Sequence, residues 1–524
     1  MNPALEANGG ARRRVLIGAC LFLVVAASIA LTARDPGLTW DEGIYYGFAL
    51  RYFDFFQNLS AESFSEARLH YTWWDGQVHP PLGKLWIALN LIAFAGGLDV
   101  VSAARMGAAI VFGLAALTLY GWIARRRGER VGLMAAGAFV LMPRIFGHAH
   151  FANLEMLTVL LWLATTVAFE RGLYSRKWSV ACGILFGLAL LTKINALFLP
   201  VVLGAWGLIF HGRKAWRNLI VMAVAGPLLF WAGWPALWHH PVAGIRAYLA
   251  DKAARDVIPV FYLGRTYGDP SAPFHYPFVM LLASTPLPIL AAGGIGIARF
   301  VRRLKEARRE AAYEGLVLAN FAFPVLLLAA PGVPRYDGIR LMLCAFPFLA
   351  VLAAEGAWAV WERLEERVER PRRTAAWIGG ATLAWLLISV ALFHPFQLCY
   401  YSELVGGPWG ARRLGFETTY WNETLDDDAV TWLNRRVPPN GRVAFVAVGG
   451  LVWQYYPAMG EARQDIGVTE FDRGDWDYLV VVPRQGMLSD EVKAFMRTHN
   501  PVWSKGPGPF DSPAVCLIYA RPST

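Results

Sequence analysis

The chain has 524 residues, of which 56% are hydrophobic and 17% are charged, and its formal net charge is +10. Ordinary soluble domains carry about 25% charged residues, so this composition excludes a soluble protein of two or three globular cores. The basic residues lie in short clusters between apolar runs, a pattern that sets orientation in a membrane and does not form a nucleic-acid-binding face. We therefore expect an integral membrane protein with no nucleic-acid partner.

Apolar runs of near-bilayer length recur from the N-terminus to residue 393. The first run, 15–34, follows Arg12, Arg13 and Arg14 and is longer than the apolar region of a signal peptide. We expect it to be a retained span with its N-terminus in the cytoplasm. Further spans, each close to the roughly 20 residues that cross a bilayer, are expected near 103–124, 131–147, 155–170, 178–192, 195–211, 216–234, 276–298, 314–331, 341–360 and 374–393.

The basic clusters test this arrangement. They lie in alternate loops, at 12–14, 125–127, 171–177, 213–217, 299–309 and 363–373. All of them fall on one side of the membrane, as the positive-inside rule requires, provided that the short run 85–97 does not cross. We interpret 85–97 as a helix lying along the interface. About eleven transmembrane helices follow, with the C-terminus outside and a count that can shift by one or two.

The chain is expected to divide into two parts. Residues 1–393 form the transmembrane part, with a long first outer loop at 35–102, and residues 394–524 form a C-terminal part of different character. In the latter, the pattern predicts a helix and three buried strands, at 426–436, 443–448, 478–482 and 515–519. We predict a small extracytoplasmic α/β domain.

The predicted topology gathers ionisable side chains at the outer surface of the membrane. They are Asp41, Glu42, His79, Lys84, Arg105, Arg144, His148, His150, Glu155, Lys193, Arg335, Tyr336, Asp337 and Arg340. Ionisable groups at membrane depth are costly and usually functional. Arginine offers a planar fork, and lysine a point charge, to phosphate oxygens, while a carboxylate beside a bound hydroxyl can act as a general base. This set suits sugar transfer from a lipid-linked phosphate.

Several motifs give the chain a specific resemblance. They are the acidic pair Asp41-Glu42 after the first span, HPPLGK at 79–84, Arg105 at the start of the second span, the second outer loop at 143–155, and PRY at 334–336. Over roughly 15–425 the chain resembles the GT-C superfamily of protein O-mannosyltransferases and aminoarabinose transferases, which use polyprenyl-phosphate sugars. The stretch from His394 to Trp421 resembles a bacterial branch of family 39-like proteins.

The resemblance implies an inverting transfer with the donor phosphate outside, on the periplasmic side of a bacterial inner membrane. Asp41 would be the catalytic base, and Glu42 would help to seat the acceptor. The expected donor-phosphate residues are His79, Lys84, Arg105, Arg335, Tyr336 and Arg340, with Lys193 as a further candidate. His79 stands where the aminoarabinose branch has Lys. Glu155 stands where the superfamily usually has Asp, so its role is either catalytic or structural.

Structural roles compete with these assignments. Asp41 is also a plausible helix cap, Lys84 a side chain that extends to lipid headgroups, and Arg105 an anchor of a span end. In the second outer loop the candidates are Arg144, His148, His150 and Glu155, and for the two histidines hydrogen bonding is favoured over metal binding. Trp73 and Trp74 are expected either to line an acceptor cleft or to join an interfacial aromatic belt.

No cofactor is expected. A divalent metal held by Asp41, Glu42 and Glu155 is the less favoured alternative, and a pairing of Cys399 with Cys516 stays open. The expected partners are a polyprenyl-phosphate sugar, membrane lipids, and an acceptor lipid, glycan or protein. Two rival functions are a lipid-linked-glycan ligase or oligosaccharyltransferase and, from a different class, a transporter or flippase, which would place polar residues near the bilayer midplane.

Overall fold

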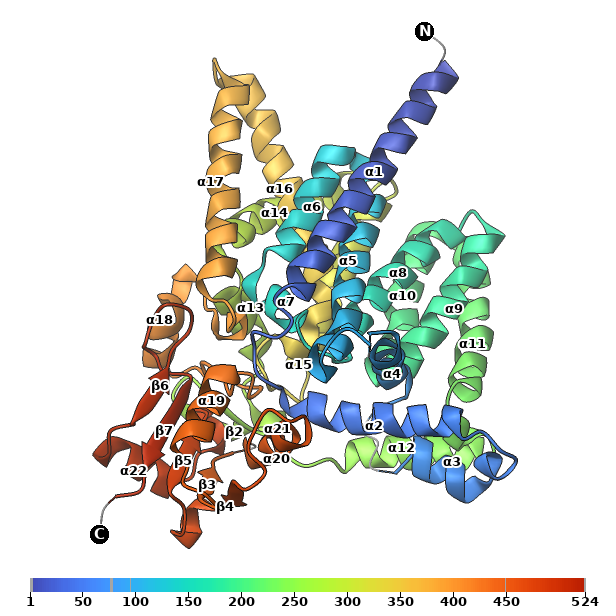
Figure 1. The fold of residues 1–524 in the computed structure, drawn as a ribbon. Helices are drawn as coiled ribbons and strands as arrows, with labels where there is room; N and C mark the ends of the chain where they lie inside the picture. The colour runs from blue at the N-terminus through green and yellow to red at the C-terminus, as the bar shows by residue number, and fades with distance from the viewer. Residues whose placement is uncertain (1–2, 76–78, 95, 448, 523–524) are drawn as a thin grey trace.

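A computed structural model describes residues 3–75, 79–94, 96–447 and 449–522. Long apolar helices form a bundle, and a small sheet packs at the end of the bundle away from the N-terminus (Figure 1). The bundle helices are α1 (Pro3–Ala30), α5 (Val100–Arg127), α6 (Glu129–Val140), α8 (Glu155–Gly172), α9 (Arg176–Thr192), α10 (Leu199–His211), α11 (Lys214–Ala232), α13 (Tyr276–Ser284), α14 (Leu287–Glu306), α15 (Ala312–Ala329), α16 (Phe346–Arg367) and α17 (Pro371–Leu392).

Each of the eleven predicted spans contains one or two of these helices, which confirms the polytopic helical fold class. Two spans differ in detail. The span at 131–147 is broken after α6, where Pro143 starts the short helix α7 (Pro143–His148), and the span at 276–298 is broken at Pro286 between α13 and α14. Proline disfavours the α conformation in the residue before it, which explains both breaks. The exact number of spans stays a prediction.

Among the described residues, seven helical segments are long and apolar enough to cross a membrane. These are Gly10–Ala30, Val100–Arg127, Ile194–His211, Lys214–Ala232, Ala312–Ala329, Arg340–Arg367 and Pro371–Leu392. The segments that include α5 and α16 are the most buried, whereas α1 and α17 expose most of their apolar side chains. The bundle is therefore built around α5 and α16, with α1 and α17 at its periphery.

Shorter helices lie across the end of the bundle that faces the sheet. Helices α2 (Trp40–Gln57) and α12 (Pro241–Ala253) run across the bundle direction, and α4 (Leu82–Phe94) is seen nearly end-on (Figure 1). Helix α4 is apolar but only 13 residues long. This orientation agrees with the interpretation of 85–97 as an interfacial helix, although residue 95 lies outside the described part of the chain.

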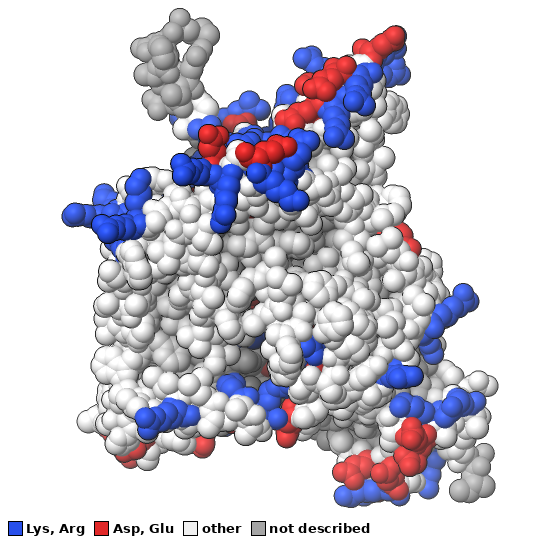
Figure 2. All heavy atoms as spheres, turned by 180° about the vertical axis from the view of Figure 1, so that it is seen from behind, with Lys and Arg blue, Asp and Glu red and all other residues white. Residues whose placement is uncertain are grey.

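The charged side chains lie mainly at the two ends of the molecule (Figure 2). On the face shown, a broad band between the ends has few Lys, Arg, Asp or Glu side chains (Figure 2). One end carries the turn between α16 and α17 together with the start of α1, and therefore two of the predicted basic clusters. A hollow opens toward the opposite end of the band, and Lys or Arg atoms are visible inside it (Figure 2).

The C-terminal part contains a five-stranded sheet of order β4-β3-β5-β7-β6. Strands β3 (Arg442–Phe445), β4 (Gly467–Thr469) and β5 (Tyr478–Val481) are parallel, while β7 (Cys516–Ala520) runs antiparallel to β5 and to β6 (Trp503–Lys505). Helices α19 (Asp427–Arg436) and α22 (Asp490–Thr498) accompany the sheet. The three predicted strands and the predicted helix are therefore present, with Val448, the expected end of the first strand, outside the described residues.

The C-terminal part shares a hydrophobic core with the membrane part. Tyr45 and Ile87, from α2 and α4, belong to the same buried cluster as Leu433, Val443 and Trp453. Each of the five cysteines is free, so the pairing left open for Cys399 and Cys516 does not occur in this structure. Burial of apolar side chains therefore joins the two parts.

Glycines allow α14 and α16 to approach closely. A methyl group at Gly356 would collide with the carbonyl oxygen of Ala292, and one at Gly296 with that of Leu352. Small residues at such positions let backbones of membrane helices pack against each other. In contrast, a methyl group at Gly379 on α17 would meet no atom within 4 Å.

Replacing Gly356 by Ala is therefore expected to destabilise the protein by about 1–3 kcal/mol through overpacking, which would lower the melting temperature of the purified protein in detergent. Gly379→Ala is the matched control and is expected to leave the melting temperature unchanged or slightly raised, because Ala favours helix over Gly. Equal melting temperatures for the two variants would contradict the close contact between α14 and α16.

Candidate active site

A single arginine joins three carboxylates at the end of the bundle that faces the sheet. Arg340 begins the short 3-10 helix η5 (Arg340–Ala345), and its guanidinium forms an ion pair with Asp41 on α2. It also donates to Glu155 at the start of α8 (Nε to Oε1, 2.8 Å) and to Asp337 (Nη1 to Oδ2, 3.0 Å). The sequence-predicted residues Asp41, Glu155 and Arg340 are thus brought together from three distant segments.

Asp41 is the most accessible of these carboxylates. Its side chain is 15% exposed, against 2% for Glu155 and 4% for Asp337. The indole N–H of Trp421 donates to Asp41 Oδ2 over 3.0 Å, and the Trp421 ring lies 4.1 Å from the Arg340 guanidinium carbon. Burial raises the pKa of Asp41; Arg340 opposes that rise and Glu155 adds to it. These surroundings make the Asp41 carboxylate more basic than a free Asp, as a proton acceptor requires.

Further cations lie beside this cluster. Lys193 forms an ion pair with Glu155 (3.1 Å), and Lys84 donates to the backbone carbonyl of His79 (2.6 Å). Burial lowers the pKa of Lys84, and Lys252 lowers it further; burial also lowers the pKa of His79, with Lys193 and Lys84 adding to the effect. A bound anion would oppose both effects and favour the charged form of Lys84.

Glu42 and Arg105 form a separate, fully buried ion pair. Two guanidinium nitrogens of Arg105 donate to the two carboxylate oxygens of Glu42, each over 2.8 Å. Arg105 also donates to the carbonyls of Ala33, Pro36 and Gly37, while Glu42 accepts from Tyr46 and from the backbone N–H groups of Thr39 and Ala152. The pair fastens the end of α1 to α2, α5 and the second outer loop. These contacts give Glu42 and Arg105 a structural role in the fold, and their expected roles at the acceptor and at the donor phosphate stay predictions.

Arg335 also serves the fold. Its guanidinium donates to the backbone carbonyls of Leu328, Pro270, Ala272 and Ala330, so it holds the loop before η5 against the segment after β2 (Arg265–Gly268). In this structure, the guanidinium N–H groups of Arg335 that were expected to bind phosphate therefore donate to backbone carbonyls. Tyr336, the next residue, lies near Arg255, whose guanidinium carbon is 5.4 Å from the ring centre, and burial raises the pKa of Tyr336 to about 12. Tyr336 stays a site candidate.

Three further candidates of the second outer loop, Arg144, His148 and His150, are buried. His148 is hydrogen-bonded to the Tyr420 hydroxyl (3.0 Å), and His150 to Thr32 and to the carbonyl of Phe146 (2.9 Å each). Arg144 donates to the carbonyl of Tyr400. These contacts match the favoured interpretation of interior hydrogen bonding for the histidines. Within the described ranges, three or more His, Cys, Asp or Glu side chains are nowhere grouped as metal ligands, and metal dependence stays an open prediction.

Trp73 and Trp74 belong to an aromatic core. Trp73, at the end of α3 (Glu66–Trp73), stacks on Tyr52 with ring centres 4.4 Å apart, and Trp74 stacks on Trp234 at 5.5 Å. Both pack α3 against α2 and the segment that follows α11. They therefore contribute to the packing of the first outer loop, and the acceptor cleft that they were expected to line stays a prediction.

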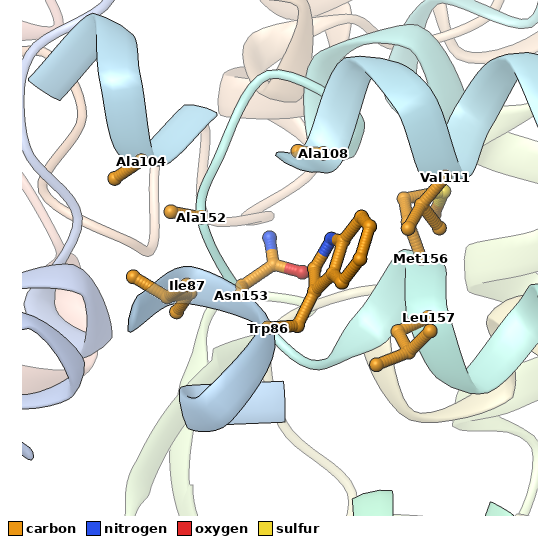
Figure 3. A pocket seen from close by; sticks show the side chains of 9 residues that line it. All are labelled: Trp86, Ile87, Ala104, Ala108, Val111, Ala152, Asn153, Met156 and Leu157. Carbon is orange, nitrogen blue, oxygen red and sulfur yellow. The ribbon is translucent and has the colours of Figure 1, made fainter. Parts of the chain in front are cut away.

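A small cavity separates α4 from the second outer loop (Figure 3). Its volume is about 10 Å³, enough for one water molecule. Trp86 and Asn153 supply polar groups to its lining, and Ala104, Ala108 and Met156 supply apolar ones. The close fit around this cavity fixes the helix that carries Lys84 against the loop that leads to Glu155.

Two contributors to the site were not assigned from sequence. Trp421 lies in the segment 415–426, every residue of which is buried. Arg484 follows β5 in the C-terminal part and donates to Asp337 Oδ1 over 2.9 Å. A resemblance motif contained Trp421 without indicating its contact with Asp41, whereas no sequence signal marked Arg484.

Comparison with known proteins places this geometry in a class. A family profile described as "Dolichyl-phosphate-mannose-protein mannosyltransferase" matches residues 78–239, which include His79, Lys84, Glu155 and Lys193. No curated protein sequence matches the chain. The family match is partial, and it covers the part of the chain that supplies the cationic side of the site.

Two crystal structures of ArnT from Cupriavidus metallidurans resemble the whole chain. The match to the structure bound to undecaprenyl phosphate covers 95% of this chain and 97% of the ArnT chain. The match to the structure in the apo state covers 98% of both chains. Each has a TM-score of 0.50 and 16% sequence identity. The chain therefore shares the fold of these ArnT structures, and together with the family profile this confirms the predicted resemblance to protein O-mannosyltransferases and aminoarabinose transferases.

The structural role of Glu42 can be tested by stability. Glu42→Gln leaves Arg105 buried beside a neutral partner, and breaking a buried ion pair from one side costs about 3–5 kcal/mol. We expect a large fall in melting temperature and in the yield of folded protein. A Glu42→Gln variant with the wild-type melting temperature would contradict a structural role.

Proposed function

We propose that the chain transfers a sugar from a polyprenyl-phosphate donor to an acceptor hydroxyl, with inversion at the anomeric carbon, at the periplasmic face of a bacterial inner membrane. The observation that carries this proposal is the contact of Asp41 with Arg340 at one end of a GT-C bundle. One residue of this pair can take a proton and the other can hold a phosphate. The match to an ArnT structure bound to undecaprenyl phosphate supports the class of donor.

Donor binding would rearrange the charges of the site. Without a donor, Arg340 is shared among Asp41, Glu155 and Asp337. The donor phosphate offers Arg340 a stronger, bidentate partner and draws on Lys84 and Lys193 beside it. Asp41 would then lose the cation that lowers its pKa, so its carboxylate becomes more basic when the donor is in place.

The transfer step follows from this arrangement. The acceptor hydroxyl gives its proton to the Asp41 carboxylate as its oxygen forms a bond to the anomeric carbon. The bond from that carbon to the phosphate oxygen breaks on the opposite face, and its electron pair leaves with the polyprenyl phosphate. Arg340, Lys84 and Lys193 stabilise the negative charge that develops there. In this mechanism the protein's own side chains supply acid–base and electrostatic catalysis, and no cofactor is required.

The base is tested by Asp41→Asn, which keeps the shape of the side chain and removes its basicity. We expect turnover to fall by about 100-fold or more, the lower range for loss of a general base, while undecaprenyl phosphate still binds. The measurement is release of undecaprenyl phosphate from a panel of undecaprenyl-phosphate sugars, in membranes that contain the acceptor pool, alongside binding of undecaprenyl phosphate to the purified protein.

Asp54→Asn is the matched control, because Asp54 lies on the same helix but contacts Asn58 and the exposed Arg68. It is expected to retain wild-type turnover. Near-normal turnover by Asp41→Asn would overturn the assignment of the base. Loss of activity in both variants would show that α2 as a whole, and not the carboxylate, had been perturbed.

The pH dependence of turnover gives a second test. Because burial raises the pKa of Asp41, the carboxylate takes up its proton at a higher pH than a free Asp, whose pKa is about 3.9. The base is therefore lost as pH falls through the raised pKa, and turnover should decline on the acid side with an apparent pKa above about 4. A turnover rate that stays constant as the pH falls below the pKa of a free Asp, about 3.9, would contradict the role of Asp41.

A further inference from the structure

The C-terminal part extends one arginine into the candidate active site. Arg484 follows β5 and is buried, with 7% of its surface exposed. One guanidinium nitrogen donates to Asp337 Oδ1 over 2.9 Å, and another donates to the carbonyl of Tyr420 over 2.6 Å. The second carboxylate oxygen of Asp337 accepts from Arg340 over 3.0 Å. Asp337 therefore bridges an arginine of the C-terminal part and the arginine that contacts Asp41.

The backbone of Asp337 is held in an uncommon conformation. Its φ is +54°, in the left-handed region, and the φ of Gly338 is +62°. A non-glycine residue pays roughly 1–2 kcal/mol for this conformation, so its surroundings must hold it there. The N–H of Gly338 donates to the Tyr276 hydroxyl over 3.0 Å, and the two arginines fix the Asp337 carboxylate. The turn that presents Arg340 thus depends on its partners.

Charge balance explains what Arg484 supplies. Asp337, Asp41 and Glu155 face three cations that contact them, Arg340, Lys193 and Arg484. Without Arg484, the buried Asp337 carboxylate would rely on Arg340 alone, because a buried charge needs a partner. Arg340 would then be held more tightly by Asp337 and would be less available to an incoming phosphate.

We propose that Arg484 is a positioning residue, which neutralises Asp337 so that Arg340 stays available to the phosphate of a lipid carrier. Its second contact, to the Tyr420 carbonyl, also fixes the residue before Trp421, whose indole holds Asp41. Arg484 therefore acts on both members of the Asp41–Arg340 pair without touching either. This role rests on the proposed function and assigns the C-terminal part a task in it.

The test compares binding of undecaprenyl phosphate by purified variants of the full chain. Arg484→Gln is expected to weaken binding by about tenfold or more, because the unpaired Asp337 carboxylate then competes with the phosphate for Arg340. Adding Asp337→Asn to Arg484→Gln removes the charge that competes for Arg340 and is expected to restore most of the binding. Because Asp337→Asn would also relieve a purely structural defect, the Kd is measured on protein shown to be folded, for which a merely structural Arg484 predicts wild-type affinity.

Arg442→Gln is the matched control, since Arg442 pairs with Asp475 on the exposed surface of the same sheet and is expected to bind as the wild type does. Arg484→Lys, which keeps the charge, is expected to bind within about threefold of the wild type, since it still neutralises Asp337 and loses only a neutral hydrogen bond. This variant carries the test if Arg484→Gln does not fold, and a tenfold loss in Arg484→Lys would overturn the role.

Two other results separate the role from the function. The positioning role alone is overturned if Arg484→Gln binds undecaprenyl phosphate as tightly as the wild type. It is also overturned if adding Asp337→Asn does not restore the binding that Arg484→Gln loses. A wild-type protein that does not bind undecaprenyl phosphate overturns the proposed function and this role with it.

Discussion

The geometry of the site depends on how one guanidinium is shared. Arg340 contacts Asp41, Glu155 and Asp337, and its flat face lies against Trp421. Burying this many charges is tolerable only because each carboxylate has a cation and each cation a carboxylate. Such an arrangement is poised to exchange partners, since a phosphate entering beside Arg340 changes the environment of every group that it holds. The side chains of the loop before η5, the second outer loop and the C-terminal part are arranged to keep this balance.

In the proposed mechanism, neighbouring residues on α2 divide the structural and chemical tasks. Successive positions on an α-helix point about 100° apart, so Asp41 and Glu42 face different surroundings. Glu42 turns inward to Arg105, where backbone carbonyls and N–H groups complete the pair. Asp41 turns toward Arg340 and keeps part of its surface open. The buried pair holds the start of α2 in place, and a precisely held carboxylate is what general-base catalysis requires.

The sequence predicted the helices well because hydropathy and basic clusters report directly on the membrane, and it predicted the strands of the C-terminal part from apolar runs. It placed Asp41, Glu155 and Arg340 in one group, and the structure brings them together. It assigned Arg105 and Arg335 to phosphate because sequence reveals a charge without its partner, and their partners are largely backbone carbonyls. Arg484 lies 147 residues from Asp337, so only tertiary structure could connect the two.

The division of the chain at residue 393 marks where the long helices end, yet the folding unit continues past it. Segment 415–426 is wholly buried and carries Trp421 to Asp41, and side chains of α2 and α4 share a core with α19 and β3. A transporter would place its ionisable groups near the bilayer midplane, whereas here they gather where the bundle meets the sheet. Because the sheet contributes Arg484 to that boundary, the C-terminal part completes the electrostatics of the site instead of merely covering it.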